Sequence, residues 1–486
     1  MRVLHVCSEI YPLLKTGGLA DVAGALPPAL VRAGCDARLL VPGFPAMMNG
    51  VANLHLIAEL PPRFGASALR LLAGTLADSG LPAYVIDAPG LYDRPGNPYY
   101  GPDNHDYSDN HRRFGLLGWM AAELALGRDP SWNADIIHGH DWHAGLAPAY
   151  LKAAEMRNGR KVAGSVFTVH NLAYQGVFPS HVFGELELPW EFFNMYGVEF
   201  YGNLSFLKAG LFYSDKITTV SPTYAREIQE PEQGCGLDGL LRGRAHDLRG
   251  ILNGVDLDVW NPAADPDIAS HYDRESLEGK RACKRALQQE AGLAVQENAP
   301  LFGVVSRLTD QKGLNLVQAG LRGILSRGGQ LVLLGSGDPA LEAAFREAAA
   351  AHPSSVSVHI GYDEKKSHRI IAGSDVILVP SRFEPCGLTQ LYGLRYGTLP
   401  LVRRVGGLAD SVVDCTAENM AQGKATGFVF DRFENEAFVA AVHRACALYA
   451  RRDEWLRIQQ CAMAQQFSWD LAAGQMQELY RQVAPR

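Results

Sequence analysis

The sequence predicts an α/β protein made of two Rossmann-like domains, each built on a parallel sheet. Its 486 residues are too many for one hydrophobic core and suit two domains of roughly 200 residues each. Near the N-terminus a strand, a glycine turn, a helix and a second strand follow one another, which is the order of a parallel α/β unit. The pentapeptide Gly-Gly-Leu-Ala-Asp occurs at 17–21 and again at 406–410, each time before an expected helix. The repeat favours two related domains, although chance reuse of a good helix start would also produce it.

The first half opens with an apolar strand at 3–7, a turn at 15–18, a helix at 19–33 and a strand at 38–42. Further strands are expected in this half at 84–87, 135–138, 165–169 and 216–220. A second cycle starts near residue 250, with strands at 301–305, 330–334, 356–360, 376–379 and 400–402. These strands end in polar residues or glycine, where open α/β sheets place their ligand sites. The stretch 230–249, rich in arginine and aspartate, is expected to be a loop or linker between the halves.

Composition excludes several classes of protein. With 47% hydrophobic and 20% charged residues, the chain is globular and not disordered. A net charge of −7 argues against a nucleic-acid or anionic-membrane surface, while leaving room for local cationic pockets. No apolar run approaches the roughly 20 residues that span a bilayer, and Glu9 and Lys15 interrupt the N-terminus before a signal-peptide core can form. Eight scattered cysteines without a CxxC pair indicate reduced thiols and a cytoplasmic location.

The turn Lys15-Thr-Gly-Gly18 lies between the first strand and the first helix. Glycines let backbone N–H groups approach an anion, and a helix start adds favourable partial charge. The GxxxxGK[ST] spacing of a P-loop is absent, so an ordinary turn with a solvated lysine is the alternative. Asp21, in the first turn of the same helix, would by itself only complement the helix dipole.

In the second half, Arg307 and Lys312 share one short loop after a strand and are candidates to bind adjacent phosphates. The segment Gly335-Ser-Gly-Asp-Pro-Ala340 resembles a dinucleotide turn, but the next strand ends in Ile360-Gly-Tyr362 without the acid that a nicotinamide cofactor needs. Glu384 stands in a Pro/Gly turn before a helix expected from Leu388, a place that suits sugar hydroxyls beside a diphosphate. Its alternative role is capping that helix.

Histidines gather at two strand ends. His138-Gly-His140-Asp-Trp-His143 looks like a metal cluster, but its spacing matches neither a helical HxxxH pair nor a structural zinc site. A polar, aromatic-lined pocket is the favoured interpretation, and His170 ends the following strand at the same edge. The pair Asp256 and Asp258 matches a DxD metal pattern that is common by chance, and we do not assign a metal to it.

Taken together, these segments resemble the bacterial glycogen synthases, which form with plant starch synthases the ADP-glucose-dependent glycosyltransferase family 5. The resemblance rests on segments spread in order over nearly the whole chain. They are Cys7-Ser-Glu9 with 15–21, HGHDWHAGL at 138–146, FTVHNLAYQG at 167–176, ILNGVD at 251–256, SRLTDQKG at 306–313, SRFEPCGLTQLYGLRYG at 381–397, VGGLAD at 405–410 and FSWD at 467–470.

The resemblance implies a GT-B fold, with two Rossmann-like domains facing a central cleft. It implies an N-terminal acceptor-side domain at 1–250, a nucleotide-sugar-binding domain at 251–464, and a final helix at 465–486 that crosses back to the N-terminal domain. It also implies an enzyme that transfers glucose with retention from ADP-glucose to the non-reducing end of an α-1,4-glucan, elongating glycogen.

Residue roles follow from the same resemblance. The catalytic group would be His170, Arg307, Lys312, Glu384 and Asp141. The nucleotide sugar would be bound by Lys15, Gly17, Gly18, Asp21, Asn253, Gly335, Tyr362, Cys386, Gly387, Leu388 and Thr389. The acceptor side would be lined by Glu9, Tyr99, Trp142 and Asn171, with Asp141 beside them.

No cofactor and no metal are expected, because side-chain cations can neutralise the departing diphosphate. The sequence offers no well-placed pair of carboxylates of the kind that provides the nucleophile of a double displacement. Front-face substitution is therefore the expected route. The expected partners are ADP-glucose and glycogen or a maltooligosaccharide, and neither nucleic acid nor a membrane. The alternatives are another GT-B nucleotide-sugar enzyme, a glucan phosphorylase, or a non-catalytic glucan-binding relative.

Overall fold

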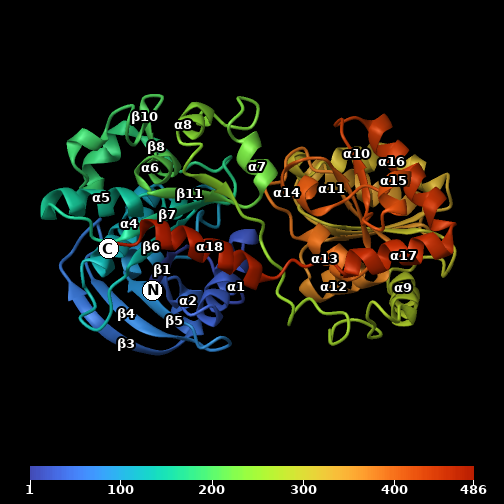
Figure 1. Ribbon diagram of the computed structural model, residues 1–486, viewed down its shortest axis with the longest axis horizontal. Helices are drawn as coiled ribbons and strands as arrows, with labels where there is room; N and C mark the ends of the chain where they lie inside the picture. The colour runs from blue at the N-terminus through green and yellow to red at the C-terminus, as the bar shows by residue number, and fades with distance from the viewer. Residues whose placement is uncertain (486) are drawn as a thin grey trace. The chain divides into compact units, whose positions relative to one another are not determined.

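The structure is a computed structural model that describes residues 1–485, and the chain divides into two compact units. Unit 1 comprises Met1–Gly254 and the C-terminal segment from Trp469, and unit 2 comprises Val255–Ser468. The boundaries expected from the sequence, after 250 and after 464, each fall a few residues before these. Each unit is an α/β layer structure (Figure 1), in agreement with the predicted fold class.

Within the described residues, unit 1 contains a nine-stranded sheet in the order β12-β11-β7-β6-β1-β2-β5-β4-β3. Its strands are parallel except for β3 and β4, which pair antiparallel with each other and, through β4, with β5. Their bounds are β1 Arg2–Val6, β2 Asp36–Pro42, β3 Val51–Leu60, β4 Leu69–Leu76, β5 Pro82–Asp87, β6 Ile136–His140, β7 Gly164–Val169, β11 Lys216–Thr219 and β12 Leu248–Gly250. A small antiparallel sheet holds β8 Val177–Pro179, β9 Glu199–Phe200 and β10 Asn203–Ser205.

Helices cover both faces of the large sheet. They are α1 Gly18–Arg32, α2 Pro45–Gly50, α3 Pro89–Tyr92, α4 Asn110–Ala125, α5 Ala147–Asn158, α6 Phe206–Tyr213, α7 Pro222–Glu227, α8 Asp238–Gly243 and α18 Trp469–Val483. Successive residues of a strand face opposite sides, so β1 divides its side chains between two layers. Leu4 and Val6 lie in the core that contains α4 and α5, whereas Val3 lies in the core formed with α1 and α18.

Unit 2 has, within the described residues, a six-stranded parallel sheet in the order β15-β14-β13-β16-β17-β18. The strands are β13 Leu301–Val305, β14 Gln330–Gly335, β15 Val356–Ile360, β16 Val376–Val379, β17 Leu399–Arg403 and β18 Phe428–Phe430. The helices are α9 Glu278–Glu290, α10 Leu314–Leu325, α11 Pro339–Ala351, α12 Glu364–Gly373, α13 Thr389–Arg395, α14 Gly406–Ser411, α15 Ala417–Ala421, α16 Asn435–Tyr449 and α17 Arg452–Met463. Phe302 and Val304 face α10 and α16, and Leu301 faces α9 and α12.

The last helix belongs to unit 1. Figure 1 shows α18, drawn in red, among the blue and green elements of this unit and beside α1. Trp469 and Met476 pack with Val22 and Leu26 of α1, and the Arg32 guanidinium donates to Asp470 Oδ1 at 2.8 Å. Burial of several large apolar side chains, at roughly 1.5–3 kcal/mol each, is enough to hold a helix of this length on the sheet.

One expectation about the chain's organisation is wrong. The stretch 230–249 is no linker, because it contains α8 and most of β12, and β12 is one of the two edge strands of the large sheet in unit 1. Its charged side chains have local partners, as Arg244 bonds Asp247 at 2.8 Å and Lys216 bonds the same carboxylate at 2.8 Å. Charge-rich composition here reflects a solvated edge and not a connection between units.

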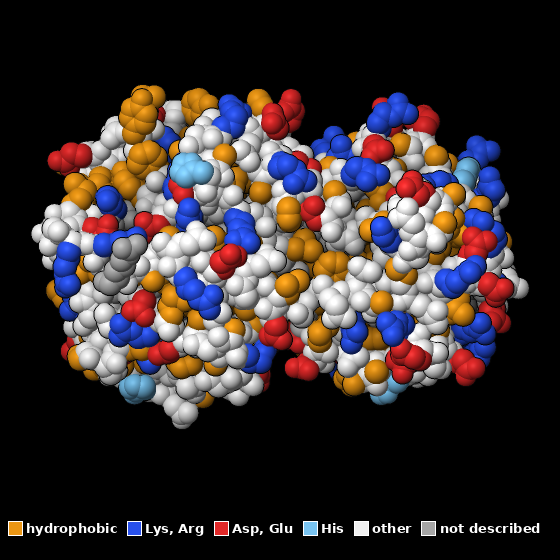
Figure 2. All heavy atoms as spheres, viewed as in Figure 1, with side chains coloured by type: hydrophobic (Ala, Val, Ile, Leu, Met, Phe, Trp, Pro, Cys, Tyr) orange, Lys and Arg blue, Asp and Glu red, His pale blue; other side chains and the backbone are white. Residues whose placement is uncertain are grey.

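On the face drawn in Figure 2, lysine and arginine side chains are interspersed with aspartate and glutamate on both units. No helix within residues 1–485 is long and apolar enough to cross a membrane. None of the eight cysteines, all of which the structure describes, forms a disulfide.

Candidate functional site

A pocket in unit 2 lies at the C-terminal ends of β13 and β16, which are neighbouring strands. It brings together most of the side chains and backbone groups predicted for the diphosphate. Its lining includes Arg307, Lys312, Glu384, Gly387, Leu388 and Thr389. The strand ends place these groups together although the two loops are far apart in the sequence.

Lys312 and Glu384 form a tight ion pair inside this pocket. Lys312 Nζ donates to Glu384 Oε1 at 2.8 Å and to Oε2 at 2.7 Å, and the Ser381 hydroxyl donates to Oε2 at 2.8 Å. Glu384 is 5% exposed, so its charge needs these partners. An ammonium group has three N–H donors, and the carboxylate uses two of them. One donor of Lys312 remains for an anion in the pocket.

Arg307 supplies a second cation. Its side chain is exposed, and within residues 1–485 it has neither a hydrogen bond nor an ion pair. The loop that begins at Gly335 runs beside it, because Leu308 N donates to Ser336 O at 2.9 Å. Tyr362 follows β15, the neighbour of β14, and is 71% exposed outside the pocket lining. An exposed aromatic ring of this kind can stack on a planar ligand group.

The turn that carries Glu384 is held by close backbone packing. Gly387 has φ +74°, where a side chain would be strained, and Gln390 Nε2 donates to the carbonyls of Cys386 and Gly387 at 2.9 and 2.8 Å. A Cβ on Gly406 would lie 1.9 Å from Glu384 O, and one on Gly407 would lie 2.1 Å from Cys386 O. The second Gly-Gly-Leu-Ala-Asp does begin a helix, α14, but its glycines are buried against this turn. These glycines therefore allow the close packing that holds the turn in place.

In unit 1, the loop at 15–18 is anchored by a buried carboxylate. Glu9 Oε2 accepts from Thr16 N at 2.6 Å and Gly17 N at 3.3 Å. Its Oε1 accepts from the Thr16 hydroxyl at 2.5 Å and from the Tyr99 hydroxyl. Glu9 is 2% exposed, so its structural role is to shape this loop. Contact of Glu9 and Tyr99 with an acceptor stays a prediction.

The loop itself presents charge at the start of α1. Lys15 Nζ lies 3.0 Å from Asp21 Oδ1, and Gly18 is the first residue of the helix. Gly17 has φ −161°, so its backbone does not require glycine, and a Cβ there would meet nothing within 4 Å. The missing side chain therefore leaves open space before the helix start, where a ligand can approach the backbone closely.

We expect Glu9→Gln to raise the KM for the nucleotide sugar by about 10-fold with a smaller change in kcat. The amide has one acceptor oxygen where the carboxylate has two, and it carries no charge, so the contacts to the loop should be weaker by about 1–1.5 kcal/mol in total. Initial-rate kinetics measure the effect, and Thr16→Val, which removes only one contact, should change KM less. An unchanged KM for Glu9→Gln would show that the loop keeps its shape without the carboxylate.

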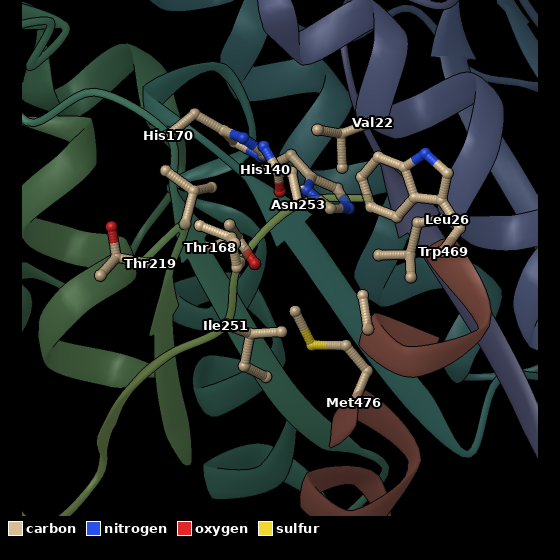
Figure 3. A pocket seen from close by; sticks show the side chains of 13 residues that line it. Val22, Leu26, His140, Thr168, His170, Thr219, Ile251, Asn253, Trp469 and Met476 are labelled. Carbon is tan, nitrogen blue, oxygen red and sulfur yellow. Dashed lines mark hydrogen bonds between the residues drawn. The ribbon is translucent and has the colours of Figure 1, made fainter. Parts of the chain in front are cut away.

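A second, narrow pocket in unit 1 lies at the ends of β6, β7 and β11. Figure 3 shows that His170 and His140 turn their ring nitrogens toward each other and that Asn253 lies beside them. Leu26 of α1 and Trp469 and Met476 of α18 close the apolar side. The structure thus brings His170 and Asn253, both predicted for the sugar, into one pocket.

Asp141 has an unusual backbone and an unusual carboxyl group. Its φ of 56° and ψ of −177° lie in a region that is essentially restricted to glycine. Its Oδ1 accepts from His170 N at 2.7 Å and from Asn171 N at 3.4 Å. Burial nevertheless raises the pKa of Asp141 to about 7, which is where a general acid or base is most effective. Trp142 follows directly and packs against Tyr99, with ring centroids 6.3 Å apart.

The histidine cluster is a set of hydrogen-bonded, neutral rings. Nitrogens of His5, His138 and His140 lie within 4.8 Å of one another, a spacing that admits a metal ion. The rings of His138 and His140 are stacked at 4.2 Å, however, and every ring nitrogen of the three except His5 Nε2 already takes part in a hydrogen bond. Stacked rings direct their lone pairs along parallel planes, which favours a hydrogen-bonded cluster over a metal centre. Asp256 Oδ1 likewise accepts Asp258 N at 3.0 Å in a local turn.

Acid should destabilise the chain through these histidines. Burial lowers the pKa of His5, His143 and His170 to about 3, so the folded state does not bind protons that the unfolded state binds below about 6.5. The free energy of unfolding should fall by about 1 kcal/mol for each such histidine at pH 5.5 relative to pH 7.5. Urea denaturation measures the difference. Replacement of buried His143 by Gln should reduce this difference in the free energy of unfolding, whereas replacement of exposed His105 by Gln should not. The same pH dependence of the free energy of unfolding in both variants would contradict this assignment.

Several residues at these sites were missed in the sequence. Ser381 bonds Glu384, Gln390 holds the turn, and His5 bonds His140 from the first strand. Position after a strand end was a signal for Ser381, and a polar residue inside the apolar run of β1 was one for His5. Gln390 lies inside a helix and gave none.

Comparison with known proteins places both halves of the chain. A family model described as "Starch synthase catalytic domain" matches residues 2–243, and one described as "Glycosyl transferases group 1" matches residues 287–457. The chain is 58% identical over 484 residues to the glycogen synthase of Francisella tularensis subsp. novicida (strain U112), covering 99% of both chains. It is equally similar to that of Francisella philomiragia subsp. philomiragia (strain ATCC 25017), covering 99% of this chain and 100% of the relative.

Solved structures agree. The catalytic domain of starch synthase IV from Arabidopsis thaliana, bound to ADP and acarbose, matches with a TM-score of 0.90 and 33% identity. The match covers 100% of this chain and 99% of that one. Sucrose-phosphate synthase from Thermosynechococcus elongatus matches with a TM-score of 0.59 at 17% identity, covering 99% and 98%, which concerns the fold alone.

Proposed function

The chain belongs to the glycogen and starch synthase family of glucosyltransferases, and on that premise we propose that it transfers glucose from ADP-glucose to the non-reducing end of an α-1,4-glucan. The GT-B fold of this family agrees with the two parallel-sheet units. Elongation of glycogen is the resulting activity.

The observation that carries the proposal is the pair of cations in the unit 2 pocket. Arg307 has five N–H donors and no partner of its own among residues 1–485, and Lys312 keeps one donor beyond those that Glu384 uses. A nucleoside diphosphate brings negative charge that an acidic protein can bind only through such a local cluster. We therefore assign the diphosphate of the donor to this pocket and its adenine to the exposed ring of Tyr362.

In the reaction, the bond between glucose C1 and the diphosphate oxygen breaks and a bond from C1 to the acceptor 4-hydroxyl oxygen forms. The hydroxyl proton passes to the departing diphosphate, so charges and atoms balance without another reactant. Negative charge grows on the leaving oxygen as the bond breaks, and Lys312 and Arg307 stabilise it there. Attack from the face of the leaving group retains the configuration at C1.

The polar groups of unit 1 are assigned to the sugars. His170 and Asn253 lie in one pocket and are assigned to the transferred glucose. Asp141, Trp142 and Asn171 are contiguous with them through the hydrogen bonds of Asp141 and are assigned to the acceptor side. Lys15, Gly17, Gly18 and Asp21 are assigned to the donor.

Transfer of radiolabelled glucose from ADP-glucose into glycogen tests this function directly. Incorporation that depends on both substrates is the expected result. Glucan binding without incorporation would favour a non-catalytic relative, and release of glucose 1-phosphate from glycogen by phosphate would favour a phosphorylase. Labelled transfer from UDP-glucose alone would overturn the choice of nucleotide.

We also propose that catalysis needs no divalent metal, because Arg307, Lys312 and the backbone at 387–389 meet the charge of the diphosphate. Transfer rates should stay within about twofold after exhaustive EDTA treatment and gel filtration. Loss of activity that magnesium restores would contradict this. The free cysteines favour a cytoplasmic location, which fractionation of cells can test.

A further inference from the structure

Three histidine side chains form a continuous hydrogen-bonded row across the sheet of unit 1. His5 Nδ1 lies 3.0 Å from His140 Nε2, and His140 Nδ1 lies 3.0 Å from His170 Nε2. The three residues stand on β1, on β6 and directly after β7, which are adjacent strands. His5 and His140 are almost fully buried, and His170 lines the unit 1 pocket. The row therefore leads from the core of unit 1 to the residue assigned to glucose, and its two outer members, His140 and His170, are labelled in Figure 3.

The row consists of imidazoles only, which couples their protons. Burial lowers the pKa of His5 and His170 to about 3 and that of His140 well below its usual value, so each ring is neutral and carries one N–H. A contact between two neutral imidazoles needs an N–H on one ring and a lone pair on the other. The choice of proton position on one ring thus dictates that on the next. Only two arrangements satisfy both contacts, one running from His5 outward and one running from His170 inward.

A neighbouring row lacks this constraint and serves as a comparison. His138 bonds the Tyr480 hydroxyl at 2.7 Å and the Thr168 hydroxyl at 2.6 Å, and Thr168 bonds the Thr218 hydroxyl at 2.5 Å. A hydroxyl group can rotate to donate or to accept, so this row transmits no proton order.

The far end of the histidine row decides between its two arrangements. His5 Nε2 is buried and has no hydrogen-bond partner in the described structure. In the inward arrangement His5 would carry its proton on Nε2, as a buried donor without an acceptor, which is rarer in proteins than an unused acceptor. In the outward arrangement His5 donates from Nδ1 to His140, His140 donates from Nδ1 to His170, and only a lone pair is unused.

We propose that His5 and His140 are positioning residues that keep the proton of His170 on Nδ1, so that His170 offers an N–H donor to a sugar hydroxyl oxygen. The nitrogen concerned, His170 Nδ1, has no hydrogen-bond partner among residues 1–485. The choice of ligand rests on the proposed function, whereas the proton position is a property of the chain alone. A fixed tautomer removes the cost of selecting one of two forms when the sugar binds.

Selective ¹⁵N-histidine labelling and long-range ¹H–¹⁵N correlation spectra at pH 8.5 read the proton position on each neutral ring. The wild-type chain should show His170 protonated on Nδ1. A proton on Nε2, or a mixture of both forms, overturns the proposal without the need for any variant or activity.

Two variants at His5 of nearly equal size test transmission along the row. In His5→Asn the amide nitrogen can replace Nδ1 as the donor to His140, so His170 should keep its proton on Nδ1. In His5→Asp the carboxylate only accepts, so His140 and His170 should each move their proton to Nε2. The change at His170 would then be transmitted through His140, the ring between it and the substituted residue. The control Tyr480→Phe alters the neighbouring row and should leave His170 unchanged. A reversal in this control, or none in a folded His5→Asp, contradicts the proposal.

Kinetics separate this role from the overall function. His5→Asp should lower kcat about 10-fold or more with unchanged ADP affinity, and His5→Asn should stay within a few-fold of wild type. Equal losses in both variants would indicate a merely structural role. If the chain transferred no glucose at all, the proposed function would fail while the spectra still decided the tautomer.

Discussion

Lys312→Ala should lower kcat by about 100-fold or more while the KM for ADP-glucose changes only a few-fold. Lys312 directs two of its three N–H donors to Glu384, so its remaining donor is fixed in direction before substrate binds. Such a donor contributes most when charge develops on the leaving oxygen, and little to ground-state binding. Initial-rate kinetics measure both parameters. Lys365→Ala is a matched control, because Lys365 is an exposed lysine of the same unit at 3.7 Å from Asp267.

Glu384, the partner of Lys312, should act on the glucose and not on the diphosphate. Glu384→Gln should lower the rate of transfer and leave ADP affinity nearly intact, because the carboxylate is assigned to the glucose ring and repels the diphosphate. Calorimetric titration with ADP compares the two variants. If Glu384→Gln lost ADP affinity while Lys312→Ala kept its full kcat, the assignments of this pocket would be reversed.

Strand ends are what the sequence predicted best. Buried parallel strands are short apolar runs, so β1, β7, β13 and β16 could be located, and the residues after them had to meet at one sheet edge. The antiparallel strands β3 and β4 were missed. In β3, Asn53, His55 and Glu59 interrupt the apolar pattern, because this strand lies at the edge of the sheet and only part of it is buried.

Interactions between distant positions could not be predicted. The charges of Lys312 and Glu384 are 72 residues apart, and His5 and His140 are 135 residues apart. Each motif could be recognised by itself, but no local pattern says which partner a side chain finds. The docking of α18 on α1 is of the same kind. Its amphipathic face predicts burial against some surface, and only the family resemblance indicated the N-terminal domain.

Asp141→Asn should make the chain more stable than wild type at alkaline pH and less active. The amide keeps an oxygen that accepts from His170 N and Asn171 N, and it removes the titratable proton. The pKa of Asp141 is about 7 in the folded state and about 4 when unfolded, so the folded state keeps a proton that the unfolded state has lost. The contribution of this group to stability is therefore complete below about pH 4 and is lost as the pH rises through 7.

Urea denaturation at pH 5 and pH 8 measures this difference. The free energy of unfolding of Asp141→Asn, relative to wild type, should rise by about 2–3 kcal/mol between the two pH values. This window is distinct from that of the buried histidines, whose protonation lowers stability below about pH 6.5. An equal pH dependence of both proteins would show that Asp141 does not titrate near 7.

The Asp141→Asn variant also tests why the chain keeps a buried carboxyl group that lowers its stability. A buried carboxyl and a glycine-like backbone conformation each cost stability, and such features persist where the activity uses them. We expect kcat/KM of the wild type to change through pH 7 and that of Asp141→Asn to be at least about 10-fold lower and flat across this range. A variant that gained stability at pH 8 and kept full activity would show that Asp141 orders the backbone at His170 by its shape alone, and not by its charge.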